Sequence, residues 1–199
     1  MNIVIIKYNA GNIESVNNAL NRLGVNAEIT ADPEKIRNAD KVIFPGVGEA
    51  STTMNYLKKH GLDKLIVSLK QPVLGICLGL QLMCSHSEEN DVDCLGIFEE
   101  KVKRFIPNPG GEYITKVPHM GWNSVSNLKS GLFSEEMENQ YVYFVHSYYA
   151  SIGEHTVATC NYVVPFSAAL QKDNFFATQF HPEKSGPTGA RILENFLRN

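Results

Sequence analysis

The sequence predicts an α/β fold: an open, mostly parallel central sheet with flanking helices and antiparallel strand additions. Strand-like and helix-like segments alternate over the first 84 residues, which is typical of a parallel sheet with helices on both faces. From residue 95 to residue 178 the strand-like segments become short and are separated by Gly, Pro and Asn. We expect these segments to form antiparallel hairpins and added strands on the same sheet, and not a second domain.

The elements of the first half follow from hydrophobic periodicity and turn residues. Apolar runs predict strands, and apolar residues at helical spacing predict helices; Gly24 ends the first helix, and Asp32 with Pro33 begins the second. The expected strands lie at residues 2–8, 25–30, 41–44 and 72–77. The expected helices lie at residues 13–23, at residues 32–39, around Met54 and Leu57, at residues 61–70 and after Cys77.

The second half is expected to consist mainly of strands and to end in a helix. Residues 87–94 are polar and predict a loop, and the short apolar segments after them predict strands. These strands are expected at residues 96–105, 112–117, 141–151, 155–162, 166–172 and 174–180, and the closing helix at residues 188–199.

Composition narrows the class of protein. The chain has 199 residues, of which 43% are hydrophobic and 20% charged, and this suits one globular domain over residues 1–199. A net charge of −3 argues against a nucleic acid or a membrane surface as partner. No apolar run is long enough for a membrane span, and residues 1–12 lack signal-peptide features, so we expect a cytoplasmic protein. The four cysteines show no metal-ligand spacing; we expect plain thiols at Cys84, Cys94 and Cys160, and no metal or cofactor.

Residues 72–83, PVLGICLGLQLM, carry the most informative pattern in the chain. A strand, a sharp turn with a nucleophile and a helix form the G-x-[Ser/Cys]-x-G elbow, with Cys77 at the turn. Side chains at Gly75 and Gly79 would collide with the neighbouring strand and helix. The backbone N–H groups at the start of the helix favour a thiolate at Cys77. Taken alone, this pattern is at least as often a buried structural cysteine.

A second motif, QFHPEKS at residues 179–185, supplies an acid–base pair. A thiolate nucleophile needs a base, and the base needs an acceptor that orients it. His181 and Glu183 at the end of a predicted strand can fill both roles, although a single histidine is usually structural. A third motif, PGVGEA at residues 45–50, is a glycine-flanked turn that can offer backbone N–H donors to an oxyanion, with the N–H of Leu78 as a second donor. Because all three motifs follow predicted strands, they predict a cysteine hydrolase or acyl transferase without identifying the acyl group.

In these three motifs the chain resembles the class I, triad-type glutamine amidotransferases. The resemblance implies that the cysteine attacks the side-chain amide of glutamine, forms a glutamyl thioester and releases ammonia. It assigns Cys77 as nucleophile, His181 as base and acid, and Glu183 as the residue that orients His181. The residues implied to line the oxyanion site are Gly46, Val47 and Leu78. The implied contacts to the amino-acid end of glutamine are Gln81 and the backbone around Ser147 and Tyr148.

Three further segments, residues 116–123, 143–150 and 171–186, resemble one branch of that family. That branch delivers ammonia to a (β/α)8-barrel cyclase subunit in histidine biosynthesis, which implies a heterodimer. The positions implied to lie near the partner are Asn12, Met120, Trp122 and Tyr143. Met120 and Trp122 could instead belong to the core. Lys7 departs from the acidic residue expected after the first strand, which leaves details of the partner-facing edge open.

Three alternatives remain beside this hypothesis. A self-contained cysteine hydrolase of related fold is disfavoured by the HPE motif and by PHMGW at residues 118–122. A catalytically dead regulatory subunit is disfavoured by the intact Cys, His and Glu. A paralogous amidotransferase that feeds ammonia to another synthase, for instance in sugar amidation, would use the same residues, and the sequence separates it least well.

Overall fold

The structure, a computed structural model, describes residues 1–8, 12–107 and 116–199. Its largest sheet has seven strands in the order β11-β12-β13-β4-β3-β1-β2. The strands of this sheet are β1 Ile3–Ile6, β2 Ala27–Thr30, β3 Lys41–Gly46, β4 Val73–Cys77, β11 Thr156–Asn161, β12 Pro165–Lys172 and β13 Phe175–Thr178. The helices are α1 Ile13–Arg22, α2 Pro33–Arg37, α3 Ala50–Lys59, α4 Leu62–Ser68, α5 Leu78–Met83 and α6 Gly186–Arg198, with 3₁₀ turns at Glu135–Met137 and Pro182–Lys184.

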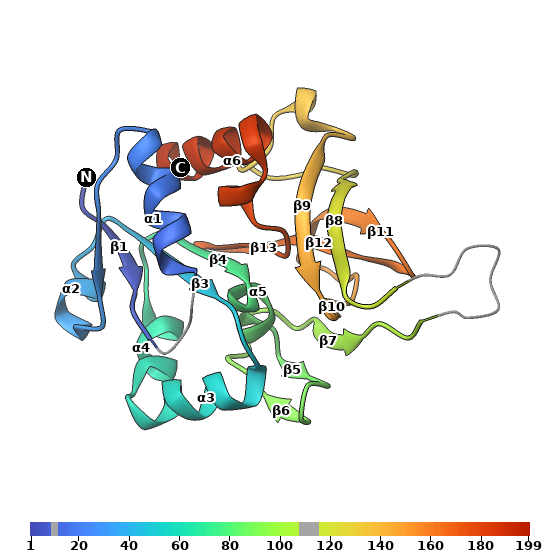
Figure 1. Cartoon of the computed structure of the whole chain (residues 1–199). Helices are drawn as coiled ribbons and strands as arrows, with labels where there is room; N and C mark the ends of the chain where they lie inside the picture. Colours follow the sequence, from blue (N-terminus) through green and yellow to red (C-terminus); the bar gives the residue numbers. More distant parts are fainter. Residues whose placement is uncertain (9–11, 108–115) are drawn as a thin grey trace.

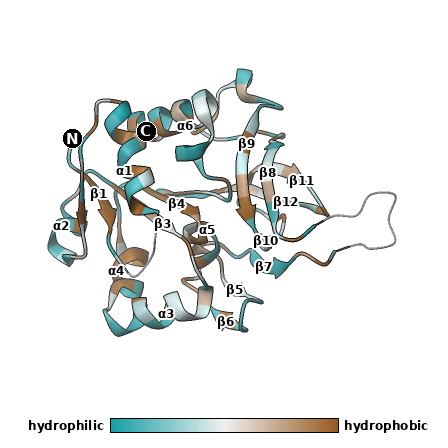
Figure 2. Cartoon of the chain, viewed as in Figure 1, coloured by the Kyte–Doolittle hydropathy of each residue, from teal (hydrophilic) through white to brown (hydrophobic). Residues whose placement is uncertain are grey.

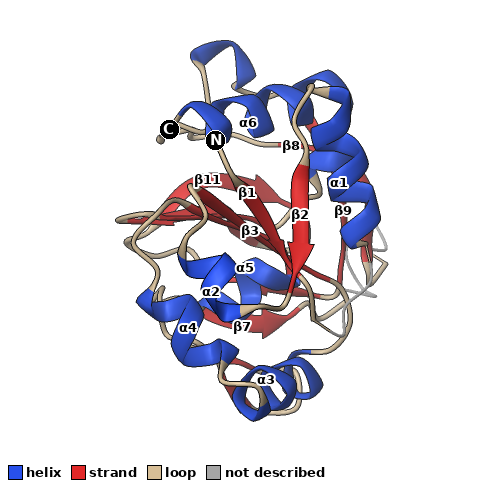
Figure 3. Cartoon of the chain, turned by 90° about the vertical axis from the view of Figure 1, so that its left-hand side faces the viewer, coloured by secondary structure: helices blue, strands red, loops and turns tan. Residues whose placement is uncertain are grey.

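The predicted fold class is confirmed. Strands β2, β1, β3, β4 and β13 pair in parallel, and β12 and β11 add to the β13 edge in antiparallel fashion. Helices cover both faces of this sheet, with α1 and α6 on one side and α2 to α5 on the other (Figures 1 and 3). Most elements of the first half match their predicted positions to within two or three residues.

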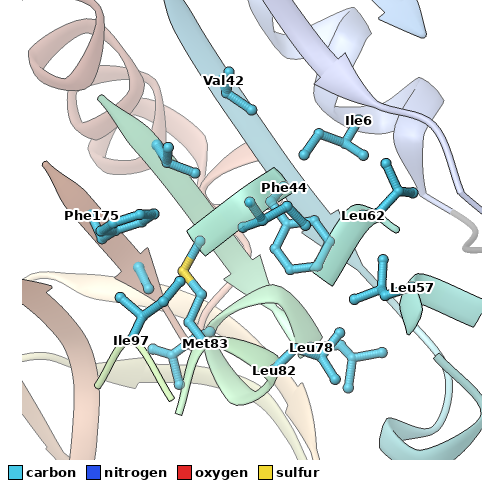
Figure 4. Close-up of a cluster of buried hydrophobic side chains, with 14 of the residues drawn as sticks. Ile6, Val42, Phe44, Leu57, Leu62, Leu78, Leu82, Met83, Ile97 and Phe175 are labelled. Atoms are coloured by element: carbon cyan, nitrogen blue, oxygen red, sulfur yellow. The ribbon is translucent and has the colours of Figure 1, made fainter. Parts of the chain in front are cut away.

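Alternate side chains of the parallel strands face opposite layers. In β1, Val4 and Ile6 join one buried cluster with residues of α2 to α5, whereas Ile3 and Ile5 join another with residues of α1 and α6. Phe44, Leu57 and Leu62 gather in the first cluster (Figure 4). Figure 2 shows hydrophobic residues along much of the central strands and many hydrophilic residues on the helices.

The expectation that the remaining strands join the same sheet is wrong for part of the second half. Strands β7 Lys101–Arg104 and β10 Tyr148–Ala150 form a four-stranded sheet with β5 His86–Ser87 and β6 Val92–Asp93. Strand β5 overlaps the start of the segment predicted as a loop, residues 87–94, and β6 lies inside it. Within the described ranges, β9 Tyr141–His146 pairs only with β8 His119–Ser124, a strand that was not predicted. The reason is a third apolar cluster: side chains of this two-stranded ribbon pack against β11 and β12 instead of extending the sheet edge. Most of the strand predicted at residues 112–117 lies outside the described residues.

Among the described residues, no helix is both long and apolar enough to cross a membrane.

Candidate active site

Cys77 occupies the bend between β4 and α5, in a backbone conformation that few non-glycine residues adopt. Its φ is +54° and its ψ is −106°. Such strain persists only where the surroundings over-determine it, and it is common at nucleophile elbows. The predicted steric role of the glycines is confirmed: a Cβ on Gly79 would lie 2.1 Å from the Phe44 carbonyl oxygen, and one on Gly75 would lie 2.8 Å from the Met83 sulfur. The bend therefore depends on close contact between strands and helix.

His181 reaches Cys77 through the topology of the sheet. It follows β13, which pairs in parallel with β4, so both residues leave the same edge of adjacent strands. The Nδ1 atom of His181 lies 2.8 Å from Oε1 of Glu183, and both side chains are buried. The other ring nitrogen, Nε2, is buried and has no well-aligned hydrogen bond to any described residue. Nε2 is thus the nitrogen left available for a reacting group.

The electrostatics of His181 favour its charged form. Burial alone lowers the pKa of His181, but the neighbouring Cys77 sulfur and the Glu183 carboxylate act more strongly in the other direction and raise this pKa to about 10. A protonated imidazole beside a cysteine stabilises the thiolate. The raised pKa therefore favours a positively charged imidazole at His181 at neutral pH.

A cavity of about 440 Å³ opens over Cys77. Its wall contains seven of the residues predicted for catalysis, the oxyanion and the substrate. They are Val47, Cys77, Leu78, Gln81, Ser147, Tyr148 and His181.

Two predicted residues lie behind the wall of this cavity. Glu183 is placed behind His181, whereas Gly46 ends β3 beside Cys77, where an added Cβ would lie 2.6 Å from the Tyr8 hydroxyl and 2.8 Å from the Leu78 Cβ. The Tyr8 hydroxyl in turn donates to the Pro45 carbonyl at 2.5 Å. Gly46 therefore allows the turn to pack closely and is not part of the cavity surface.

The amide side chains of Gln81 and Gln179 connect the cavity wall to the sulfur. Nε2 of Gln81 donates to the Tyr148 carbonyl at 2.9 Å and to Oε1 of Gln179 at 3.1 Å. Nε2 of Gln179 then lies 3.8 Å from the Cys77 sulfur. Gln179 was not predicted from the sequence. The feature that could have indicated it is a polar glutamine at the end of an apolar strand.

Glu89 and His146 also line the cavity and were not predicted. Glu89 accepts a hydrogen bond from the Ala50 N–H at 2.7 Å, and partial burial raises the pKa of its carboxyl group. It lies in the polar segment after α5, where nothing distinguishes it from neighbouring acidic residues. His146 ends the apolar strand β9, so a polar residue in an apolar run was its only signal.

The four residues predicted near a partner divide into two groups. Met120 and Trp122 are 64% and 55% exposed, so the alternative that they belong to the core is wrong. Tyr143 is half-buried and packs edge-to-face against Trp122, with 6.0 Å between the ring centres. Asn12 instead lies beside the acid–base pair, where its amide donates to Oε1 of Glu183 at 2.6 Å.

No group of three or more His, Cys, Asp or Glu side chains in the described ranges could hold a metal ion. All four cysteines are free thiols.

The fold and this site define a class of protein. The family model described as glutamine amidotransferase class-I matches residues 4–199, and the chain belongs to that family. A crystal structure of a glutamine amidotransferase has the same fold: its TM-score is 0.73 at 19% identity, covering 98% of this chain and 97% of that one.

The curated relatives narrow the class to one group. A protein from Bacteroides thetaiotaomicron named imidazole glycerol phosphate synthase subunit HisH is 62% identical over 197 residues, which are 99% of both chains. The HisH subunit of Escherichia coli strain K12 is 45% identical over 199 residues, again 99% of both chains. Within the class-I glutamine amidotransferases, the chain thus groups with the HisH subunits.

Proposed function

We propose that this chain hydrolyses glutamine through a thioester on Cys77 and delivers the ammonia to a (β/α)8-barrel cyclase subunit. The cyclase then makes imidazole glycerol phosphate and AICAR in histidine biosynthesis. The observation that carries the proposal is the buried His181–Glu183 pair beside a sulfur held at a strained strand–helix bend. The names of the relatives support the pathway.

In the first half of the reaction, the Cys77 thiolate attacks the side-chain amide carbon of glutamine. The carbonyl oxygen becomes an oxyanion, which the backbone N–H groups of Val47 and Leu78 stabilise. The imidazolium of His181 gives a proton to the leaving nitrogen, the C–N bond breaks, and ammonia departs from a glutamyl thioester. Glu183 keeps the His181 ring oriented and stabilises its positive charge.

In the second half, water attacks the thioester carbon. Neutral His181 now accepts a proton from that water, and the oxyanion forms again in the same place. Collapse of this intermediate breaks the C–S bond, so that glutamate leaves and the thiolate–imidazolium pair is restored. No cofactor takes part in either half.

Residues of the cavity wall can bind the amino-acid end of glutamine. Glu89 is the one carboxylate among the described lining residues, and we assign it to the α-ammonium group. Gln81 and the backbone around Ser147 and Tyr148 hold the same end of the substrate. Gly46 supports the oxyanion turn from behind.

The surface next to the cavity fits a docking partner. Met120 and Trp122 are exposed, and β9, the strand paired with theirs, supplies Val145 to the cavity wall. Exposed apolar side chains of this size are typical of interaction sites. We therefore place the cyclase over Met120, Trp122 and Tyr143, and we expect Asn12, which donates to Glu183, to lie near the same partner. The cytoplasmic location and the single domain over residues 1–199 remain predictions.

The alternative is an amidotransferase subunit that feeds a different synthase, since the glutaminase residues would be the same. A test is ammonia release from glutamine, measured with the chain alone and with purified (β/α)8-barrel cyclase carrying its ligand. We expect the loaded cyclase to raise turnover at least tenfold, with saturation at one cyclase per chain. Hydrolysis that no cyclase concentration stimulates would favour the alternative.

A further inference from the structure

Two buried histidines face each other next to the active-site cavity. His119 of β8 and His146 of β9 are directly paired across the two-stranded ribbon, and 3.0 Å separates Nδ1 of His119 from Nε2 of His146. Their exposed fractions are 3% and 6%. His146 also lines the cavity, whereas His119 lies stacked between Phe144 and Tyr162. Neither histidine has a role in the reaction derived above.

The hydrogen bonds around the pair allow one arrangement of protons. The amide nitrogen of Asn123 donates to the Asn161 carbonyl at 2.9 Å and faces Nε2 of His119 at 3.3 Å, so Nε2 of His119 accepts. His119 therefore carries its proton on Nδ1 and donates it to Nε2 of His146. His146 carries its own proton on Nδ1 and donates it to the Tyr148 carbonyl at 2.7 Å.

Both rings remain neutral in this arrangement. A second proton on either ring would place two donors against each other, at Asn123 for His119 or at His119 for His146. Burial acts in the same direction: it lowers the pKa of His119 to about 4, and it is the largest cause that lowers the pKa of His146 to about 3. Because both nitrogens of His146 are engaged, this residue is not available as a base in the cavity.

The hydrogen bonds continue from Tyr148 to the sulfur. The Tyr148 carbonyl that accepts from His146 also accepts from Gln81, whose amide donates in turn to Gln179, and the Gln179 amide faces Cys77. The chain of contacts thus runs from β8 and β9 through β10 and α5 to the end of β13. These elements meet around the cavity, with β8, β9 and β10 beside one another in Figure 1.

We infer that His119 and His146 are positioning residues for glutamine binding: as a neutral pair they fix the Tyr148 carbonyl, and through it Gln81, at the end of the cavity that holds the amino-acid part of the substrate. This inference rests on the proposed function, because it assumes glutamine in the cavity. It adds to that function two residues that never touch the reacting atoms. The pair also lies on the ribbon whose outer residues include Met120 and Trp122, so one small element carries both the support of the cavity and the exposed face.

The test compares two reagents that alkylate Cys77 in the purified full-length chain. A chloromethyl ketone analogue of glutamine needs the amino-acid end of the cavity, whereas iodoacetamide does not. The variants are His119→Phe and His146→Leu, which remove the donors, with His119→Asn and His146→Asn as matched controls that keep a donor at the Nδ1 position. We expect the first two to react about tenfold more slowly with the glutamine analogue and within twofold of the parent with iodoacetamide. The Asn variants should recover most of the loss.

Three results would overturn the inference. They are unchanged reaction with the glutamine analogue, an equal loss with both reagents, or Asn variants no better than Phe and Leu. A parent chain that reacts with iodoacetamide but not with the glutamine analogue would instead overturn the proposed function. Imidazole ¹⁵N NMR of the parent provides a second readout: both rings should be neutral with the proton on Nδ1 from pH 6 to pH 8, and a charged ring or a proton on Nε2 would contradict the inference.

Discussion

The imidazole of His181 lies between the Cys77 sulfur and the Glu183 carboxylate, and it is buried away from solvent. Glu183 holds one ring nitrogen at 2.8 Å, and Asn12 donates to the same carboxylate oxygen. Because the pKa of His181 is raised on folding, this residue stabilises the folded state. Its contribution is fully present below the unfolded pKa near 6.5 and is lost as the pH rises through about 10. At the scale of single residues, the charge on this ring is therefore the quantity to test.

Replacing Glu183 by Gln should lower the pKa of His181, because it removes the negative charge that stabilises the imidazolium. NMR titration should show the parent ring protonated through pH 8 and the variant ring losing its proton at lower pH. Glutamine turnover should fall by roughly a hundredfold, within the range for loss of acid–base assistance. Glu154→Gln, at an exposed carboxylate, is the control. An unchanged His181 titration in Glu183→Gln would refute this assignment.

Replacing Glu89 by Gln should weaken glutamine binding without affecting the chemical step, because Glu89 lines the cavity and we assign its carboxylate to the α-ammonium group and not to the reacting amide. The KM for glutamine should rise about tenfold while kcat stays within threefold of the parent, which is the pattern for lost uniform binding. Steady-state kinetics of ammonia release measure both constants. A fall in kcat at unchanged KM would contradict the placement of the ammonium group.

At the scale of elements, the junction of β4 with α5 leaves little room for an added side chain. Its helix is only six residues long and is held by contact with β3 at Gly79. The ribbon of β8 and β9 differs, because one face is buried against β11 and β12 while Met120 and Trp122 on the other are exposed. Packing at the junction should thus set the geometry of Cys77.

Gly79→Ala tests, with one added methyl group, whether packing at the β4–α5 junction sets the geometry of Cys77. The added Cβ would overlap the Phe44 carbonyl, so we expect a loss of about 3 kcal/mol in the free energy of unfolding and much slower alkylation of Cys77. Gly96→Ala is the matched control: Gly96 has a φ of +66° and open space around it, so only backbone strain of about 1 kcal/mol is expected. Urea denaturation gives both values. Equal effects of the two substitutions would show that contact with β3 is not the cause.

At the scale of the whole molecule, the sequence could predict the features that depend on neighbouring residues, namely apolar strands and short motifs. The parallel strands follow from apolar runs such as residues 2–8, and Cys77, His181 and Glu183 stand out because each follows a strand within a short motif. The sequence could not predict that His119 faces His146 or that Gln179 reaches Cys77, because a buried polar side chain finds its partner only through tertiary packing. For the same reason it predicted no strand at β8 and placed the strand at residues 141–151 on the main sheet, although the apolar face of β9 packs against β11 and β12.

The neutral histidine pair predicts how stability depends on pH. His119 and His146 have pKa values lowered to about 4 and about 3, while in the unfolded chain both accept protons near pH 6.5. Below pH 6.5 the unfolded state binds more protons, so the free energy of unfolding falls as the pH falls toward 4. His181 adds little to this slope, because its contribution is already complete there. Each histidine contributes about 2 kcal/mol, so we expect the pair to lower the free energy of unfolding by about 4 kcal/mol between pH 7 and pH 5.

Urea denaturation at a series of pH values measures this slope, and His119→Asn provides the comparison. Because asparagine does not titrate in this range, the variant should lose less stability between pH 7 and pH 5 than the parent. Equal slopes would mean that His119 accepts a proton in the folded state.

The most direct test of the central claim is mass spectrometry of the Cys77 peptide after acid quenching during glutamine turnover. The account predicts a glutamyl group on Cys77 of the parent, no such group on Cys94, and loss of both the adduct and ammonia release in Cys77→Ala. Ammonia release by Cys77→Ala at the parent's rate, with no adduct on Cys77 of the parent, would contradict it.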